Sequence, residues 1–193
     1  MGIASSCGSR SEARLTAWII LAGLPGAGKS TLARALSVRL GGVILDKDRV
    51  REALFPDALT DYTREQDDLC MRAIYEAAAY LSRQGLNGQG MAAYVFLDGR
   101  TFSRREQIEE AVHAAEQAGA VCRILHVVCA DDVAEARLSA QDPTHPARNR
   151  DAHLYRMVKN RFEEIARPHA TVDTTNGVEP ILDTAAAYAA HGE

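Results

Sequence analysis

The chain has 193 residues, of which 47% are hydrophobic and 25% charged, and its formal net charge is −4 at pH 7. This length and composition predict one folded domain with its own core, and they exclude a largely disordered chain. The acidic balance, without a long block of one sign, argues against a nucleic-acid partner. No stretch reaches the roughly 18 apolar residues of a membrane span, and no secretory signal is recognisable.

The four cysteines, at positions 7, 70, 122 and 129, are not spaced as metal ligands. The absence of a Cys-x-x-Cys pair argues against a zinc site. Free cysteines are typical of a reducing compartment, so we expect a cytoplasmic protein.

The first 16 residues are mostly small and polar, and they predict a flexible tail ahead of a domain over residues 17–193. Gly2, Ser6 and Cys7 also match a lipidation pattern, with Gly2 as the myristoylation site. Because such short patterns are common by chance, we predict the tail and not the lipid anchor.

Apolar runs alternate with helical patterns along the rest of the chain. The runs predict five strands, at residues 18–22, 42–46, 94–98, 122–129 and 171–175. Helices are predicted at 30–40, 64–83, 103–118, from 131 or 132 onward, at 154–165 and at 178–190. In the second helix, Leu69, Ala73, Ala77 and Leu81 are expected to face the core. Continuous apolar strands separated by helices predict an α/β domain with a doubly wound parallel sheet, covered on both faces.

The segment "GLPGAGKS", residues 23–30, lies between the first predicted strand and the first predicted helix. It satisfies the pattern G-x-x-x-x-G-K-[ST], in which glycines allow backbone N–H groups to wrap a phosphate. The lysine reaches the β- and γ-phosphates, and the serine hydroxyl binds Mg²⁺. The sequence therefore predicts a site for a nucleoside triphosphate with Mg²⁺. Its predicted members are Gly23, Pro25, Gly26, Ala27, Gly28, Lys29, Ser30 and Thr31.

Two aspartates and an arginine follow the second predicted strand, in the string "LDKDRVR". In a parallel sheet the carboxyl ends of the strands face the ligand, so Asp46 and Asp48 are expected near the γ-phosphate. A carboxylate there can orient the proton of an acceptor hydroxyl, and Arg51 can hold a polar acceptor. An aspartate before a helix is also an ordinary N-cap, so the spacing leaves both roles open.

Taken together, "GLPGAGKSTLA" and "LDKDRVR" resemble the small P-loop kinases of the AAA_33-like type. The two motifs are most similar to those of adenylylsulfate kinase; zeta toxins, chloramphenicol phosphotransferase, gluconate kinase and polynucleotide kinase share the plan. The resemblance implies a three-layer P-loop NTPase fold like that of nucleoside-monophosphate kinases. It also implies transfer of the γ-phosphate of ATP to a hydroxyl of a small molecule. By this resemblance Asp48 is the catalytic base, Asp46 the second candidate, and Arg51 the acceptor-binding residue.

Two later segments are expected to complete the site. Asp98 ends the third apolar run, where a carboxylate can hold Mg²⁺ through water. Arg100, Arg104 and Arg105 follow it and face either the acceptor or solvent. The resemblance implies an arginine-bearing lid at about 139–150. Arg137 precedes this lid, Arg148 lies in it and Arg150 at its end; Arg137 and Arg148 are expected to contact the nucleotide.

Some features leave the acceptor open. The string "DGRTFSRR" stands where adenylylsulfate kinases carry "ISPYR", and Lys47 replaces a glycine of that family. Candidate acceptors are adenylylsulfate, a sugar, a nucleoside or an antibiotic. The alternatives are an ATPase or switch module acting through a protein partner, and a polynucleotide 5′-hydroxyl kinase. The preference for ATP over GTP is an expectation from the resemblance, and the sequence leaves the oligomeric state open.

Overall fold

The computed structural model describes residues 16–84, 94–140 and 152–192. The strands are β1 (Ala17–Ala22), β2 (Val43–Asp46), β3 (Tyr94–Asp98), β4 (Val121–Val128) and β5 (Ala170–Asp173). The α-helices are α1 (Lys29–Leu40), α2 (Lys47–Leu54), α3 (Arg64–Gln84), α4 (Arg105–Gln117), α5 (Asp131–Ser139), α6 (Ala152–Lys159) and α7 (Leu182–His191). Two 3₁₀ turns, η1 (Asp57–Leu59) and η2 (Glu179–Ile181), complete the described elements.

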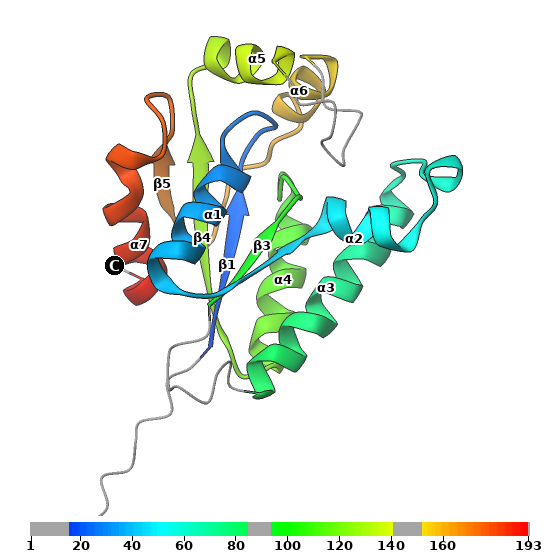
Figure 1. Ribbon diagram of the computed structural model, residues 1–193, viewed down its shortest axis with the longest axis vertical. Helices are drawn as coiled ribbons and strands as arrows, with labels where there is room; N and C mark the ends of the chain where they lie inside the picture. Colours follow the sequence, from blue (N-terminus) through cyan, green and yellow to red (C-terminus); the bar gives the residue numbers. More distant parts are fainter. Residues whose placement is uncertain (1–15, 85–93, 141–151, 193) are drawn as a thin grey trace, which may run out of the picture.

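The five strands form one parallel sheet in the order β2-β3-β1-β4-β5. The glycine-rich loop after β1 therefore lies at the centre of the sheet, and the ends of β3 and β4 lie on either side of it (Figure 1). Asp46, at the end of β2, is in register with Asp98, at the end of β3. The carboxyl edge of the sheet thus brings together the motifs that the sequence places far apart.

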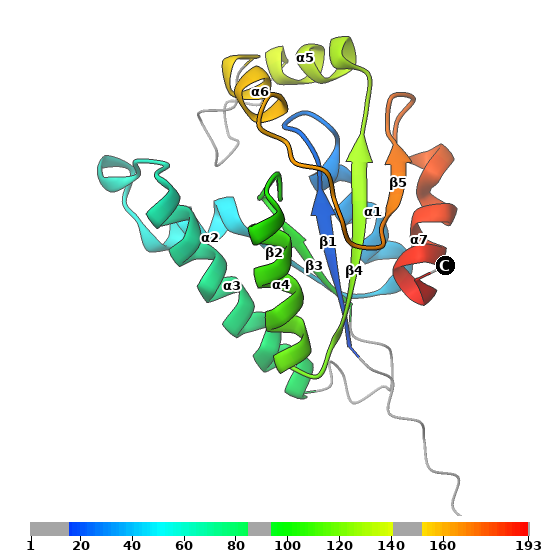
Figure 2. The same ribbon diagram turned by 180° about the vertical axis from the view of Figure 1, so that it is seen from behind.

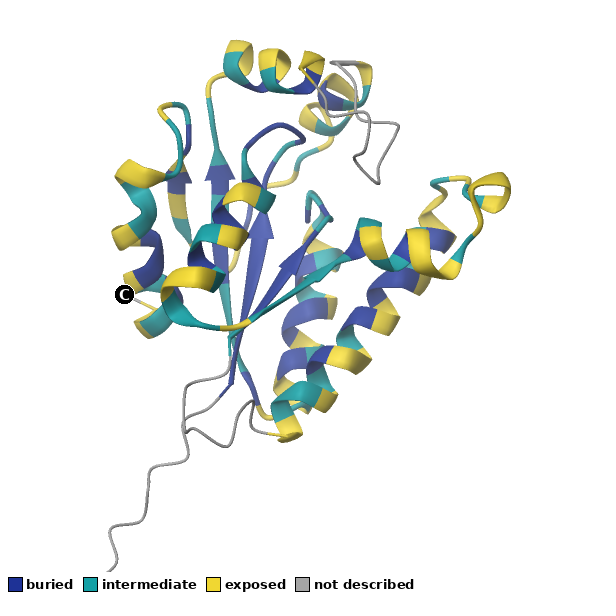
Figure 3. Ribbon diagram, viewed as in Figure 1, coloured by how far each residue is buried: buried dark blue, intermediate teal, exposed yellow. Residues whose placement is uncertain are grey.

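Helices cover both faces of the sheet, which confirms the predicted fold class. Helices α1 and α7 pack on one face, while α3 and α4 pack on the other (Figures 1 and 2). Because both faces are covered, β1 is buried along its whole length and β3 along nearly all of it, as the dark blue arrows of Figure 3 show. This explains why β1 reads as an unbroken apolar run and not as an alternating one.

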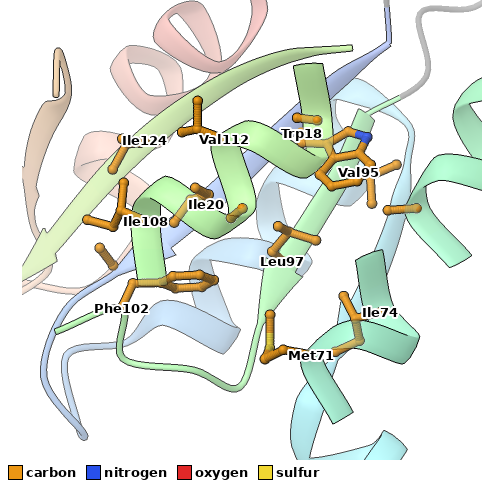
Figure 4. Packing of buried hydrophobic residues seen from close by; sticks show 14 of the residues in the cluster. Trp18, Ile20, Met71, Ile74, Val95, Leu97, Phe102, Ile108, Val112 and Ile124 are labelled. Atoms are coloured by element: carbon orange, nitrogen blue, oxygen red, sulfur yellow. The ribbon is translucent and has the colours of Figure 1, made fainter. Parts of the chain in front are cut away.

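One hydrophobic cluster fills the space between the sheet and helices α3 and α4. Figure 4 shows its side chains, among them Met71 and Ile74 of α3 and Phe102 of the loop before α4. Trp18 of β1 is fully buried there; its indole Nε1 donates a hydrogen bond to Ser82 Oγ (2.9 Å), and its ring stacks on Tyr75. Strand β1 and helix α3 are therefore locked to each other by packing and by a satisfied polar contact.

The predicted core face of helix α3 is wrong. Leu69, Ala73 and Ala77 are exposed, whereas Cys70, Met71, Ile74 and Ala78 are buried. The helix is rich in alanine, so several faces have similar hydrophobicity, and the periodicity alone does not choose among them. Packing against α4 and the sheet selects the face that carries the larger Met71 and Ile74 side chains.

Smaller differences concern the ends of helices. The helix predicted over 103–118 begins at Arg105, and its N-cap is Arg104, not Ser103. The helix predicted over 154–165 ends at Lys159, after which the chain runs back toward β5 without regular structure. Residues 1–15 of the predicted tail, Gly2, Ser6 and Cys7 among them, lie outside the described residues. So do residues 141–150 of the predicted lid, with Arg148 and Arg150.

Candidate active site

The glycine-rich loop packs so tightly that two of its glycines have no room for a side chain. A Cβ at Gly23 would lie 2.2 Å from the Val127 carbonyl oxygen, and one at Gly26 would lie 2.8 Å from that of Ala134. Gly26 also has a positive φ of 79°, which glycine adopts without strain. The backbone of β4 and α5 therefore closely constrains the loop.

The loop, the start of α1 and the edges of α2 and α6 enclose a cleft of about 560 Å³. Of the predicted nucleotide-binding residues, Pro25, Gly26, Gly28, Lys29, Ser30 and Thr31 line it. Gly23 and Ala27 are not among the described lining residues: Gly23 packs against β4, and the Ala27 side chain is buried. Six of the eight predicted nucleotide-binding residues thus line the cleft, and the other two, Gly23 and Ala27, pack against the rest of the protein.

Lys29 begins α1 and is buried, and its ammonium group folds back over the loop. Its Nζ donates hydrogen bonds to the carbonyl oxygens of Gly23 (2.9 Å) and Leu24 (2.7 Å). The charge is therefore held at the mouth of the loop, beside the N–H groups at the start of a 12-residue helix. A helix N-terminus and a lysine together favour a bound polyphosphate.

Arg137 of α5 lines the same cleft, but its guanidinium is used to brace the loop. It donates hydrogen bonds to the carbonyl oxygen of Gly26 (3.3 Å) and to both Oγ1 (3.1 Å) and the carbonyl oxygen of Thr174 (2.7 Å). Thr174, which is itself buried, donates from Oγ1 to the carbonyl oxygen of Ala27 (2.8 Å). The residue expected to contact nucleotide thus ties the loop to the end of β5.

Asp46 and Asp48, the two aspartates of "LDKDRVR", have different surroundings. Asp46 is the N-cap of α2: its Oδ1 accepts hydrogen bonds from the backbone N–H groups of Asp48 (2.8 Å) and Arg49 (3.4 Å). Burial and the nearby carboxylates of Asp98 and Asp48 raise its pKa above the ordinary value. Among the described residues, Asp48 lines the cleft and Asp46 does not.

Asp48 belongs to a square of four charged side chains that lines the same cleft as the loop. Arg51 lies 3.0 Å from Asp48, and Lys47 lies 3.6 Å from Asp48 and 3.0 Å from Asp67. The fourth contact joins Arg51 to Asp67. Arg51 and Lys47 are both buried, and the Arg51 guanidinium also lies over the ring of Tyr62, 5.1 Å from its centroid. Two cations and two carboxylates balance in this square.

Lys47 is a buried lysine of the square, and its pKa departs from the ordinary value. Burial lowers its pKa to about 8, with Arg51 and Arg100 acting in the same direction and Asp48 opposing them. The sequence left this lysine between a substrate contact and a solvent position; the structure shows it buried and lining the cleft.

Asp98 ends β3 and is only 2% exposed, yet its Oδ1 has no hydrogen-bond partner among the described residues. A buried carboxylate oxygen without a partner is costly unless a ligand or ion satisfies it. Ser30 and Asp98 line the same cleft, and hydroxyl and carboxylate oxygens suit Mg²⁺. Within the described ranges no group of three or more His, Cys, Asp or Glu side chains is arranged to hold a metal ion.

The three arginines after β3 separate into different environments. Arg100 is buried and donates a hydrogen bond to Asp68 (2.6 Å), while Arg104 is partly exposed and lies 3.4 Å from Glu106. Arg105 is exposed, and it is not among the described residues that line the cleft. Of these three arginines, Arg100 alone lines the cleft, while Arg104 and Arg105 lie at the start of α4 and are partly or fully exposed.

Sequence reasoning missed Asp67, Tyr62 and Gln107, all of which line the cleft. Asp67 and Tyr62 lie in or before α3, where the helical pattern gives no sign that one turn faces a site. The only available signal was the charge density of "REQDD" at the start of the helix.

No helix in the described part of the chain is long and apolar enough to cross a membrane.

Comparisons with solved structures agree with this fold. An inferred kinase from Chloroflexus aurantiacus superimposes with a TM-score of 0.66 at 24% identity, over 89% of this chain and 97% of that one. The APS kinase CysC of Mycobacterium tuberculosis, solved with AMPPNP and APS, gives 0.63 at 15% identity, over 89% and 95%. Kti12 of Chaetomium thermophilum, solved with ADP-AlF3, gives 0.60 at 17% identity, over 87% and 96%.

These structural neighbours show the fold of the small P-loop kinases. A search of curated protein sequences finds no significant match. The family model AAA_33, described as an AAA domain, matches residues 19–176, which include the glycine-rich loop, the charged square and Asp98. The chain therefore belongs to the AAA_33 family of AAA domains.

Proposed function

We propose that the protein is an ATP- and Mg²⁺-dependent kinase that phosphorylates a hydroxyl group of a small molecule. One observation carries this proposal: the glycine-rich loop and a carboxylate paired with two buried cations line the same cleft. Hydrolysis of ATP would need only a positioned water near the γ-phosphate. A set of paired charged side chains can instead bind and orient an acceptor molecule.

The nucleotide half of the proposed site is the segment from Gly26 to Thr31. Backbone N–H groups of the loop and Lys29 would bind the phosphates of ATP, with Ser30 and, through water, Asp98 as the Mg²⁺ ligands. When bound, Mg²⁺ neutralises charge on the β- and γ-phosphate oxygens. The unpartnered Oδ1 of Asp98 supports this assignment, because it is an oxygen ligand without another contact among the described residues.

The acceptor half is the charged square. Asp48 is the proposed catalytic residue, which orients the acceptor hydroxyl and takes up its proton as the O–P bond forms. Arg51 holds Asp48 in place through the 3.0 Å contact, and its Nε has no hydrogen-bond partner among the described residues, so it can also bind the acceptor. Asp46 is assigned the N-cap role and not catalysis, because its carboxylate is used by the backbone of α2.

A second candidate is an ATPase module that acts through a protein partner. The likeness to Kti12, which binds ADP-AlF3 in its solved complex, supports this alternative at the level of the fold. The two functions differ in the fate of the phosphate: a kinase transfers it to an acceptor, and an ATPase releases it to water.

The deciding experiment is an acceptor screen with γ-labelled ATP and Mg²⁺. The pools contain adenylylsulfate, sugars, nucleosides, antibiotics and 5′-hydroxyl oligonucleotides. We expect label in one small-molecule pool, and an Asp48→Asn variant should lose about a thousandfold in transfer while binding ATP normally. Asp132→Asn, an equal change at an exposed position of α5, is the matched control. Label released only as free phosphate with every pool would favour the ATPase module.

A further inference from the structure

A second recess opens beside the cleft, on the acceptor side. It measures about 250 Å³ and shares Tyr62, Asp67, Arg100, Gln107 and Val158 with the cleft. No described residue of the glycine-rich loop lines it. An acceptor whose hydroxyl lies at Asp48 could therefore extend into the recess without displacing the nucleotide.

Four arginines from four separate parts of the chain line this recess. Arg64 begins α3, Arg100 follows β3, Arg104 is the N-cap of α4, and Arg161 follows α6. Figure 2 shows how the fold brings these parts together, because the chain leaving α6 passes near the start of α4. In sequence they span almost a hundred residues, so the cluster is a product of the fold and not of a local charge run.

The ion pairs around the recess leave more guanidinium groups than carboxylates. Arg64 and Arg104 share Glu106, at 2.7 and 3.4 Å, while Arg64 and Arg100 share Asp68, at 3.5 and 2.6 Å.

Glu110 adds a longer contact, 3.9 Å from Arg100. Asp67, the acidic residue that lines the recess, is already balanced within the square by Lys47 and Arg51. Arg161 has no ion-pair partner among the described residues, so outside the square the four guanidinium groups have three carboxylate partners between them.

Gln107 adds a polar atom at the boundary between recess and cleft. Its Oε1 is buried and has no hydrogen-bond partner among the described residues. As an acceptor-only atom it suits a hydroxyl or N–H group of a ligand, not an anion. The boundary thus suits a hydroxylated group, while the recess beyond it suits a negative one.

We propose that the acceptor is a small anionic hydroxy compound, whose carboxylate, sulfate or phosphate group is held by Arg104 and Arg161 while its hydroxyl lies at Asp48. This inference rests on the proposed kinase function and specifies the acceptor class. Guanidinium groups bind such anions with two parallel hydrogen bonds, which fixes orientation as well as charge. A recess of about 250 Å³ admits one such group and not a length of polynucleotide.

The test uses matched acceptor pairs that differ in the anionic group. The pairs are gluconate with glucose, glucose 6-phosphate with glucose, and adenylylsulfate with adenosine; a 5′-hydroxyl oligonucleotide is a separate arm. With labelled ATP, we expect the anionic member of at least one pair to be phosphorylated with a kcat/KM at least about tenfold above its neutral partner. Which pair responds distinguishes a carboxylate from a phosphate or a sulfate.

The double variant Arg104→Gln/Arg161→Gln tests the residues themselves. It should raise KM for the anionic acceptor about tenfold or more, with kcat and the KM for ATP nearly unchanged, because two charge-assisted hydrogen bonds are lost. Arg161→Lys should keep part of the affinity. Arg83→Gln, at an exposed position near the other end of α3, is the matched control and should behave as the wild type.

The outcomes separate this inference from the proposed function. Equal use of neutral and anionic members, transfer to the oligonucleotide alone, or an unchanged acceptor KM in the double variant would overturn the anionic class while leaving a kinase. No transfer to any acceptor, with ATP binding intact, would contradict the kinase itself and the inference with it.

Discussion

The two halves of the cleft are built in different ways. The nucleotide half is a single loop whose shape is set by backbone packing, with Gly23 against β4 and Gly26 against α5. The acceptor half is a set of charged side chains from α2, α3 and the loop after β3, held by one another. A local motif is sufficient for the first half, whereas the second exists only when distant elements have packed.

This difference has a functional meaning. A polyphosphate is recognised by features common to all nucleotides, so a fixed backbone cradle suits it. An acceptor is particular to each enzyme, and side chains on separate elements can change without altering the sheet. The comparison predicts that changes in the loop affect every reaction of the protein, and that changes in the square affect only the acceptor.

The largest effect is expected for Lys29→Ala. Loss of the ammonium group removes the charge that the loop holds beside the phosphates, so transfer should fall by about a thousandfold or more. Transfer of label from ATP measures the effect, and thermal unfolding controls for folding. Activity within tenfold of the wild type would contradict the role of the loop.

Asp67→Asn should have the next largest effect, and only on the acceptor half. The change leaves Lys47 and Arg51 short of one negative charge, so Asp48 is pulled from its position. We expect kcat/KM for the acceptor to fall about a hundredfold, with the dissociation constant for ATP unchanged. Equal losses for ATP and acceptor would show that the two halves are not separable.

As the pH rises above about 8, we expect the rate of transfer to fall while the contribution of Lys47 to stability increases. As the pH rises through about 8, Lys47 loses its proton, and Asp48 and Asp67 lose a positive partner. The rate of transfer should then fall about tenfold per pH unit above 8.

The contribution of Lys47 to stability has the other sign. Its pKa is lowered from 10.5, so between pH 8 and 10.5 the unfolded chain binds more protons than the folded one. This contribution to the free energy of unfolding therefore increases with pH over that range. Lys47→Arg should remove both effects, because an arginine stays charged. A wild-type profile in that variant would show that another group titrates.

The smallest effect is expected for Thr174→Val, which tests the brace behind the loop. The change removes the hydrogen bonds between Oγ1 and the Ala27 carbonyl oxygen and between Arg137 and Oγ1, while the bond from Arg137 to the Thr174 carbonyl oxygen remains. We expect a loss of about 1–2 kcal/mol in the free energy of unfolding, measured by urea denaturation. An unchanged midpoint would show that the brace does not stabilise the loop.

The fold and the nucleotide half could be predicted because their signals are local. Five apolar runs and one glycine-rich pattern each occupy a short stretch, and the order of strands and helices follows from their alternation. The role of Asp46 could not be predicted, because an N-cap and a catalytic aspartate have the same place in the sequence. The face of α3 could not be predicted either, since Ala73 and Ala77 resemble Ala78 until the helix packs.

The acceptor half shows most clearly which contacts the sequence does not predict. Asp67 lies 16 residues from Arg51, on another helix, and only the packing of α2 against α3 brings them together. The same holds for Arg161, which reaches the recess because α6 ends early and the chain turns back. Long-range placement of charges is a property of tertiary structure, and no window of sequence contains it.

The burial of Trp18 has a practical consequence. It is the only tryptophan of the chain, and it lies between β1, which leads into the glycine-rich loop, and α3, which carries Asp67. The tryptophan fluorescence of the protein therefore comes from this one residue. Without any added label, its emission spectrum reports on the contact between β1 and α3. Titrations with nucleotide and with acceptor can be followed at this single residue, and a red shift marks the separation of the two elements on unfolding.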